Sequence, residues 1–341
     1  MTPALFSRSP RAVLAALALG VLGAFTVAAA AEDRLPTTVP AGTKLVVADQ
    51  NEALQTLMIA SGQHAKLAAS TSYANFIGGP QILEAFRAGA LDLATVGNTP
   101  PIQAQAAGEE ILIVAAIVTA EPDYKFALRP GLTLTTLEDL RGKRIAYAEG
   151  TGRQPFVLNA LKSAGLTRKD VTLVPLRSGD MPDAVRAGQV DVAPLNEPHY
   201  SRYLSDYAGQ GPLAFPDAVY DKLPQGLNYL YASGASLRDP AKAAAIRDFV
   251  IRWIAANRWR DAEPEAWVQA YFVQRQRLKP EDARAIVASV GPASFPLLSE
   301  LIARQQALVD LIYSAGDLPK HLDASKEFDL RFDEAIRTAG E

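Results

Sequence analysis

Polar residues suited to holding a small ligand follow several predicted strands, each at the point where a helix begins. They are Gly97-Asn98-Thr99, Gly150-Thr151-Gly152-Arg153 and Asn196-Glu197-Pro198. The first turn of a helix leaves backbone N–H groups unpaired and carries the positive end of the helix dipole, so such a turn favours an anion. In open α/β sheets, ligands bind beyond the carboxyl ends of the strands. These turns therefore predict a binding edge.

Residues for covalent or metal chemistry are scarce. The chain has no cysteine, and its three histidines, His64, His199 and His321, are too far apart in sequence to suggest a metal site. Glu197 and His199 would be an acid–base pair, but residues two apart need not face each other. We therefore expect no catalytic residue, no metal and no cofactor. An exported enzyme remains the weaker alternative.

The elements that position the polar turns occur twice in similar form. Residues 85–94 read AFRAGALDLA and residues 184–193 read AVRAGQVDVA. Each copy reads as a helix opened by proline, a glycine stop, a short apolar strand and a polar turn. Two such units predict two α/β lobes whose strand ends face a shared cleft. The alternative is two ordinary αβ units, because Ala-Gly before a strand is common.

The rest of the chain continues the alternation of strands and helices. Strands are predicted at 44–48, 144–148 and 171–175, and the β-branched run 111–118 reads as a central strand. From Pro240 onward the pattern is helical, with proline opening most of the segments. The sequence predicts an α/β fold with a helical tail.

The N-terminus indicates export. Residues 1–31 combine a basic start, an apolar run and small residues at the end, as in a secretory signal peptide cut after Ala30 or Ala31. A retained membrane anchor is the alternative, since the apolar run is long enough to span a bilayer. Without cysteine there is neither a disulfide nor an N-terminal lipid anchor. We expect a periplasmic protein that is not a lipoprotein.

The composition suits a folded protein with a sizeable core. The 341 residues are 49% hydrophobic, and this length suits two domains better than one. A net charge of −3 and the lack of a basic stripe give no sign of nucleic-acid binding.

Three stretches resemble the sulfonate, taurine and nitrate-type periplasmic binding proteins of ABC importers, most closely the aliphatic-sulfonate branch. They are 78–108, 137–152 and 305–319, and the resemblance spans roughly 43–335 in family order. It implies a type II periplasmic-binding-protein fold, α/β with two lobes, two hinge strands and a C-terminal helical tail. The boundaries it implies are 43–126 plus 230–335 for lobe one with the tail, 130–226 for lobe two, and hinges near 124–130 and 227–232.

The resemblance also implies where the ligand would lie. A sulfonate has one negative charge and three acceptor oxygens, so it needs several N–H and O–H donors. The candidate ligand-binding residues are Gln50, Asn51, Gly79, Asn98, Thr99, Thr151, Gly152, Arg153, Asn196 and Glu197. The family tends to carry Trp-Asp-Pro where this chain has Asn196, Glu197 and His199. This departure leaves the ligand open among alkyl and aryl sulfonates, taurine, nitrate and other small anions.

The implied partners are an inner-membrane ABC permease and its ATPase, with the binding protein expected to be a monomer. A periplasmic sensor module of the same fold is the first alternative. The family's fold also includes a desulfinase and a pyrimidine-synthesising enzyme that rely on cysteine, which this chain lacks.

Overall fold

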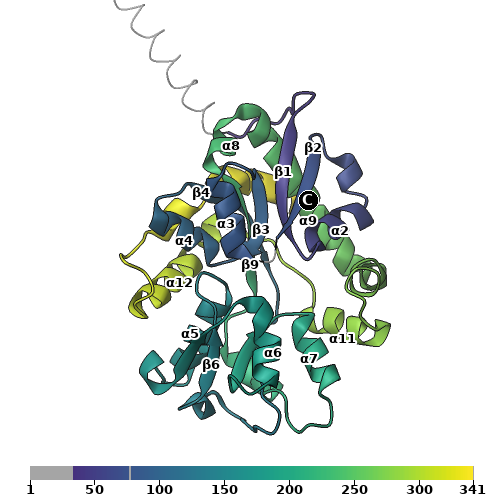
Figure 1. Cartoon of the computed structure of the whole chain (residues 1–341). Coiled ribbons are helices and arrows are strands. Elements are labelled where there is room, and N and C mark those ends of the chain that lie inside the picture. Colours follow the sequence, from purple (N-terminus) through teal and green to yellow (C-terminus); the bar gives the residue numbers. More distant parts are fainter. Residues whose placement is uncertain (1–33, 77, 341) are drawn as a thin grey trace, which may run out of the picture.

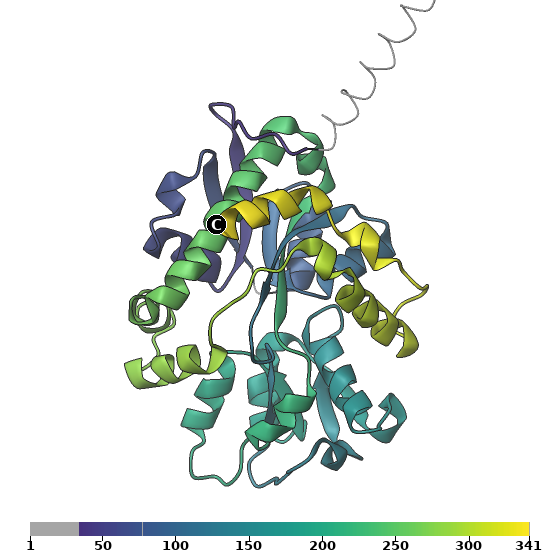
Figure 2. The same cartoon turned by 180° about the vertical axis from the view of Figure 1, so that it is seen from behind.

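The chain folds into two lobes, one above the other in the view of Figure 1 and again from behind in Figure 2. The computed structural model describes residues 34–76 and 78–340. The predicted signal peptide, 1–31, lies outside the described residues. Each lobe is built on one β-sheet with helices around it.

The upper lobe contains a five-stranded sheet in the order β2-β1-β3-β9-β4. Its strands are β1 (Lys44–Gln50), β2 (Ser70–Phe76), β3 (Leu93–Gly97), β4 (Ile111–Val118) and β9 (Leu227–Ser233). The pairs β1–β2 and β1–β3 are parallel, whereas β9 lies antiparallel to β3 and β4. The prediction that 111–118 is a central strand is wrong, because β4 lies at the edge. It is apolar because the tail covers it, through bridges from Ser294 and Phe328.

The lower lobe contains a four-stranded sheet in the order β5-β8-β6-β7. Its strands are β5 (Lys125–Leu128), β6 (Arg144–Tyr147), β7 (Thr172–Pro175) and β8 (Val192–Leu195). β6 is parallel to β7 and β8, while β5 is antiparallel to β8. All four residues of β8 are buried, as expected for a strand with both faces covered.

Helices surround both sheets, and proline stands in the first turn of several of them, where its missing N–H leaves no bond unmade. The α-helices are α2 (Ala53–Ala60), α3 (Gly79–Arg87), α4 (Pro100–Ala107), α5 (Arg153–Ser163), α6 (Met181–Arg186), α7 (His199–Asp206), α8 (Gly234–Arg238), α9 (Pro240–Ala262), α10 (Pro264–Trp267), α11 (Pro280–Val290), α12 (Ile302–Ser314) and α13 (Asp333–Gly340). Within 34–76 and 78–340, no helix is both long enough and apolar enough to span a membrane.

Shorter helical turns join these elements. A π-helix, η6 (Val268–Val273), links α10 to the segment before α11. The 3₁₀ turns are η1 (His64–Lys66), η2 (Leu137–Leu140), η3 (Arg168–Asp170), η4 (Ser178–Asp180), η5 (Asp217–Lys222), η7 (Leu298–Glu300), η8 (Ala324–Glu327) and η9 (Leu330–Phe332).

The chain passes between the lobes at two places that lie just before the predicted hinges. It leaves the upper sheet after β4 and enters the lower sheet at β5, so the first crossing is 119–124. It returns just before β9, which belongs to the upper sheet. The predicted hinge ranges 124–130 and 227–232 therefore fall mostly within strands. Hydrogen-bonded pairing to neighbouring strands holds these ranges. The two crossings bond to each other, since the Thr119 N–H donates to the Gly226 carbonyl and the Gly226 N–H donates to the Glu121 carbonyl.

The helical tail divides between the lobes, whereas the resemblance placed all of it on lobe one. Ile336 of α13 and Phe249 of α9 join the hydrophobic core of the upper lobe. Val309 and Ile312 of α12 instead join a core with Phe156 of α5, in the lower lobe. The helix packs there because its buried stripe faces α5 across the junction between the lobes.

The repeated sequence has one structural role in both lobes. Asp92 exchanges two hydrogen bonds with Val46 of β1, through its own N–H (2.9 Å) and its carboxylate (2.8 Å). Asp191 makes the same pair with Arg144 of β6, at 2.8 and 2.9 Å. Gly89 and Gly188 end the preceding helices at φ 68° and 70°, a conformation that favours glycine. Each repeat thus aligns a strand with its neighbour, at the end opposite the cleft.

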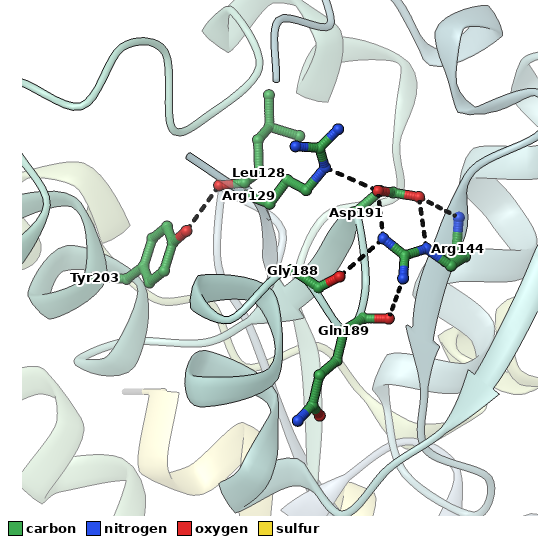
Figure 3. Close-up of polar contacts among 7 residues, drawn as sticks. All are labelled: Leu128, Arg129, Arg144, Gly188, Gln189, Asp191 and Tyr203. Carbon is green, nitrogen blue, oxygen red and sulfur yellow. Dashed lines mark hydrogen bonds and ion pairs between the residues drawn. The ribbon is translucent and has the colours of Figure 1, made fainter. Parts of the chain in front are cut away.

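Asp191 is held by arginines as well as by the backbone, as Figure 3 shows. Its carboxylate accepts hydrogen bonds from the guanidinium of Arg144 (2.9 Å) and from Nε of Arg129 (2.9 Å). Arg144 also donates to the carbonyls of Gly188 and Gln189. Beside this cluster, the Tyr203 hydroxyl donates to the carbonyl of Leu128 at 2.8 Å. Although burial opposes it, the bonds from the two arginines and the Arg144 N–H lower the pKa of Asp191 to about 2.

We expect Asp191→Asn to reduce the free energy of unfolding at pH 7 by about 1–2 kcal/mol. Because the pKa is lower in the folded than in the unfolded state, this stabilisation is present above about pH 4 and is lost as the pH falls toward 2. Urea unfolding of wild type and variant at pH 7, 5, 4 and 3 measures it. The difference in the free energy of unfolding between wild type and variant should become smaller below pH 4. The control is Asp183→Asn, at an exposed carboxylate of the same lobe, which should unfold like the wild type at every pH.

Candidate ligand-binding cleft

A cleft of about 530 Å³ lies between the two lobes. Its walls come from the turns that follow β1, β3, β6, β7 and β8, together with the first crossing, 119–124. Eight of the ten predicted ligand-binding residues line it: Gln50, Asn51, Gly79, Thr151, Gly152, Arg153, Asn196 and Glu197. Polar turns that are up to about 150 residues apart in sequence thus meet at one site, because they all stand at carboxyl ends of strands.

The other two predicted residues, Asn98 and Thr99, do not line the cleft. Thr99 is fully buried, and its hydroxyl donates to the Asn98 side chain at 3.2 Å. The Asn98 carbonyl accepts from Nε2 of Gln305 in α12 at 3.1 Å. Asn98 also borders a smaller cavity, which Asp123 and Tyr124 of the crossing line as well. Gly97 itself lines the cleft, and the chain turns inward directly after it. The structure therefore gives Thr99 a packing environment.

Arg153, at the start of α5, is the basic residue of the cleft. Only 9% of it is exposed. Its Nε donates to the carbonyl of Pro194 at 3.1 Å, and its guanidinium donates to the side-chain oxygen of Asn196 at 2.5 Å. The guanidinium also lies 4.9 Å from the centre of the Tyr124 ring. These contacts fix the orientation of the guanidinium at the cleft wall.

Arg153 has no carboxylate within ion-pair distance in the part of the chain that the structure describes. Burial lowers the pKa of its guanidinium, which shows that the charged form lacks full compensation. A buried charge without a counter-charge is costly in a protein interior. A bound anion would supply the missing charge and bidentate acceptors at this position.

Three of the four carboxylates that line the cleft are already engaged by N–H and O–H donors. Asp49 accepts from the backbone N–H of the next residue and from two backbone N–H groups at the start of α2. Asp123 accepts from the backbone of Leu227 and the side chain of Asn228. Glu197 accepts from the hydroxyl and N–H of Ser201. Burial nevertheless raises the pKa of all three. By accepting these hydrogen bonds, the three carboxylates stabilise the turns and helix ends around the cleft.

Thr151 and Gly152 form the turn that presents Arg153. The Thr151 hydroxyl donates to the carbonyl of Ala148 (2.8 Å) and accepts from the Arg153 N–H (3.3 Å). A Cβ at Gly152 would lie 2.7 Å from the Tyr124 hydroxyl, closer than real contacts allow. A Cβ at Gly97 of the upper lobe would come within 3.8 Å of the Gly152 backbone. Glycine at position 152 therefore leaves room for Tyr124, while the two lobes are in ordinary van der Waals contact at Gly97.

The turn after β1 is held in an unusual conformation. Asn51 and Glu52 have φ values of 56° and 59°, in the left-handed region that costs energy for residues other than glycine. Outside contacts support it: Gln276 donates to the Asn51 carbonyl (3.1 Å), and Arg275 pairs with Glu52 (2.9 Å). The tail therefore fixes the turn that brings Gln50 and Asn51 to the cleft.

Several cleft residues were not among the sequence predictions. Asp123 and Tyr124 come from the first crossing, and Asn228 from β9. None of these residues stands at the start of a helix, so the pattern that identified the other turns could not identify them. Ser178 and Gly179 also line the cleft, and they do follow a predicted strand, 171–175, so a sequence signal for them existed. His199 lines it too, and burial together with Arg153 and Arg202 lowers its pKa, which favours the neutral ring.

Two α/β lobes, two crossings and a polar cleft between them define a two-lobed solute-binding protein. No group of three or more potential metal-ligating side chains occurs within the described ranges. The site can orient an anionic head group at Arg153 and enclose it between the lobes.

Comparisons with known proteins agree with this class. Residues 78–200 match the family described as NMT1/THI5 like. A relative from Escherichia coli (strain K12), whose name proposes aliphatic sulfonate binding, is 27% identical over 253 residues, 74% of this chain and 77% of the relative. The resemblance to the aliphatic-sulfonate branch is thereby confirmed.

Solved structures confirm the predicted fold class. The alkanesulfonate-binding protein SsuA from Xanthomonas axonopodis pv. citri, solved bound to MOPS, is 27% identical with a TM-score of 0.72, covering 85% of this chain and 99% of SsuA. The periplasmic aliphatic sulphonate binding protein SsuA from Escherichia coli shares the fold, at 21% identity and a TM-score of 0.68, covering 84% of this chain and 92% of that one.

Proposed function

We propose that this chain is the periplasmic solute-binding component of an ABC importer, and that it holds a sulfonate in the cleft for delivery to a membrane permease. The observation that carries the proposal is the buried Arg153, which faces the cleft without an acidic partner among the described residues. The similarity to sulfonate-binding proteins over most of the chain supports the same ligand class.

The charges of the cleft favour a monoanion. Arg153 shares the lining with the carboxylates of Asp49, Glu121, Asp123 and Glu197. A second negative charge on the ligand would be repelled by these groups. A sulfonate carries a single charge with three acceptor oxygens, whereas sulfate carries two. A ligand that also bears an amine, such as taurine, is compatible with the acidic part of the lining.

Closure of the lobes is the proposed mechanism of capture. The ligand first contacts one lobe, and rotation at the crossings then brings Arg153 and Gly152 of the lower lobe against the upper lobe. Contacts made only in the closed state would drive this shift of population. The predicted signal peptide supports export to the periplasm, and the proposal includes no catalytic step.

The test is a binding series on the mature chain from residue 32, measured by thermal melting and calorimetry. The series contains alkyl and aryl sulfonates, taurine, nitrate and sulfate. A sulfonate at a hundred times its dissociation constant should stabilise the fold by about 2.7 kcal/mol, raising the melting temperature by about 5 °C. Sulfate should bind at least about tenfold more weakly than the best sulfonate, because of the carboxylates.

Two outcomes would contradict this proposal. If no sulfonate changes the melting temperature, the ligand class is wrong. If mass spectrometry shows that the bound sulfonate has been converted, the protein is an enzyme. Recovery of the unchanged ligand from a stable complex is the expected result.

A further inference from the structure

A second cavity, which we call the annex, opens beside the cleft. It has a volume of about 730 Å³, larger than the cleft itself. Its walls come from the end of α9, from α10 and η6, and from α11. Glu197 and Val290 line both the cleft and the annex. The two cavities are therefore adjacent and share a boundary.

The annex is apolar where the cleft is polar. Its lining includes Trp267, Val268, Phe272, Ile286, Val287 and Val290. The charged residues at its rim pair with one another: Arg260 with Asp261 at 2.7 Å and Arg284 with Glu265 at 2.9 Å. Glu197 is held by Ser201. Such a surface suits an uncharged apolar group, because the transfer of apolar surface out of water lowers the free energy.

The annex begins close to the proposed position of the anionic head group. Arg153 donates to Asn196 at 2.5 Å, and the next residue, Glu197, already lines the annex. Neighbouring Cα atoms are about 3.8 Å apart. A ligand whose head lies at Arg153 therefore has only to extend past Asn196 and Glu197 to reach the annex.

The wall of the annex is firmly built and contacts both lobes. The rings of Trp267 and Tyr271 stack at 4.8 Å, within 7° of parallel, across the start of the π-helix η6. The segment after η6 is tied to the upper lobe by the Arg275–Glu52 ion pair. It is tied to the lower lobe by Arg202 of α7, which donates to the Gln276 carbonyl. Figures 1 and 2 show α11 extending from the upper lobe toward α7.

We propose that cleft and annex form one compartment for a sulfonate with a large apolar extension, an aryl or long-chain alkyl sulfonate. The head group pairs with Arg153, and the apolar part occupies the annex. This inference rests on the proposed function and specifies its substrate class. It predicts that affinity grows with the apolar part of the ligand, by about fourfold for each methylene that the annex encloses.

The test is calorimetry of the chain from residue 32 with 1-alkanesulfonates from methane- to octanesulfonate and with benzenesulfonate. We expect octanesulfonate to bind at least about 100-fold more tightly than methanesulfonate, by the gain per methylene. Ala288→Trp places a large ring at an exposed helix position that lines the annex. It should leave methanesulfonate binding unchanged and bring octanesulfonate down to within about tenfold of it.

Ala285→Trp is the matched control, an exposed alanine of the same helix outside the annex lining. It should not affect either ligand. Affinity that is independent of chain length, or an equal loss of both ligands in Ala288→Trp, would overturn the annex and leave the proposed function intact. Failure of every sulfonate to bind the wild type would overturn both.

Discussion

Replacing Arg153 by methionine should weaken sulfonate binding at least about 100-fold and leave the melting temperature of the ligand-free protein almost unchanged. The loss of affinity follows because the ligand loses its charged, bidentate donor, and truncating one partner of a buried charge pair typically costs several kcal/mol. The stability is retained because methionine fills similar space and removes a buried charge that has no acidic partner among the described residues. Calorimetry gives the affinity, and thermal unfolding without ligand gives the stability.

The control is Arg186→Met, which removes the same charge from an exposed position in the same lobe. It should bind sulfonate like the wild type. Arg153→Lys should retain part of the affinity, because it keeps the charge and loses the bidentate fork. Wild-type affinity in Arg153→Met would remove the central support for the proposed site. A large fall in melting temperature would show that Arg153 serves the fold instead.

Asp317→Ala should lower the free energy of unfolding by about 3–5 kcal/mol, the largest effect on stability that we expect from a single polar residue. Asp317 follows α12 in the tail, and its side chain is 7% exposed. It accepts hydrogen bonds from Tyr147 (2.7 Å), Gln154 (2.8 Å) and Arg168, all in the lower lobe. The alanine would leave the buried hydroxyl of Tyr147 and amide of Gln154 without this acceptor. Urea unfolding measures the loss.

Two substitutions separate the contributions at Asp317. Arg168→Ala removes only the partly exposed guanidinium and should cost about 1 kcal/mol. Asp317→Asn keeps an acceptor for the Tyr147 hydroxyl and should fall between. Gln154 also accepts the N–H of Gly150 at 3.0 Å, so Asp317→Ala should weaken sulfonate binding as well, through the turn that presents Arg153. Equal losses in all three variants would mean that the ion pair alone accounts for the stability.

The sequence alone determined the class of fold and most of the turns that line the cleft. Helix starts, terminal glycines and apolar strand runs are local patterns, because each can be recognised within about ten consecutive residues. Because parallel strands bring their carboxyl ends to one edge, local signals at Gln50, Thr151 and Asn196 were enough to gather these residues in one site. The doubled motif likewise predicted two lobes, although its aspartates align strands and do not reach the cleft.

Only the tertiary structure decided which side chains face the ligand. Thr99 and Thr151 occupy the same local pattern, a threonine at a helix start, yet Thr99 is fully buried and Thr151 lines the cleft. The turn at Asn98 beside Thr99 is bonded by Gln305 of α12, about 200 residues away in sequence, and the turn at Thr151 is not. The burial of Arg153, the attachment of Asp317 to the lower lobe and the apolar annex have the same origin. They depend on contacts between distant segments, and no pattern along the chain records which segments will meet.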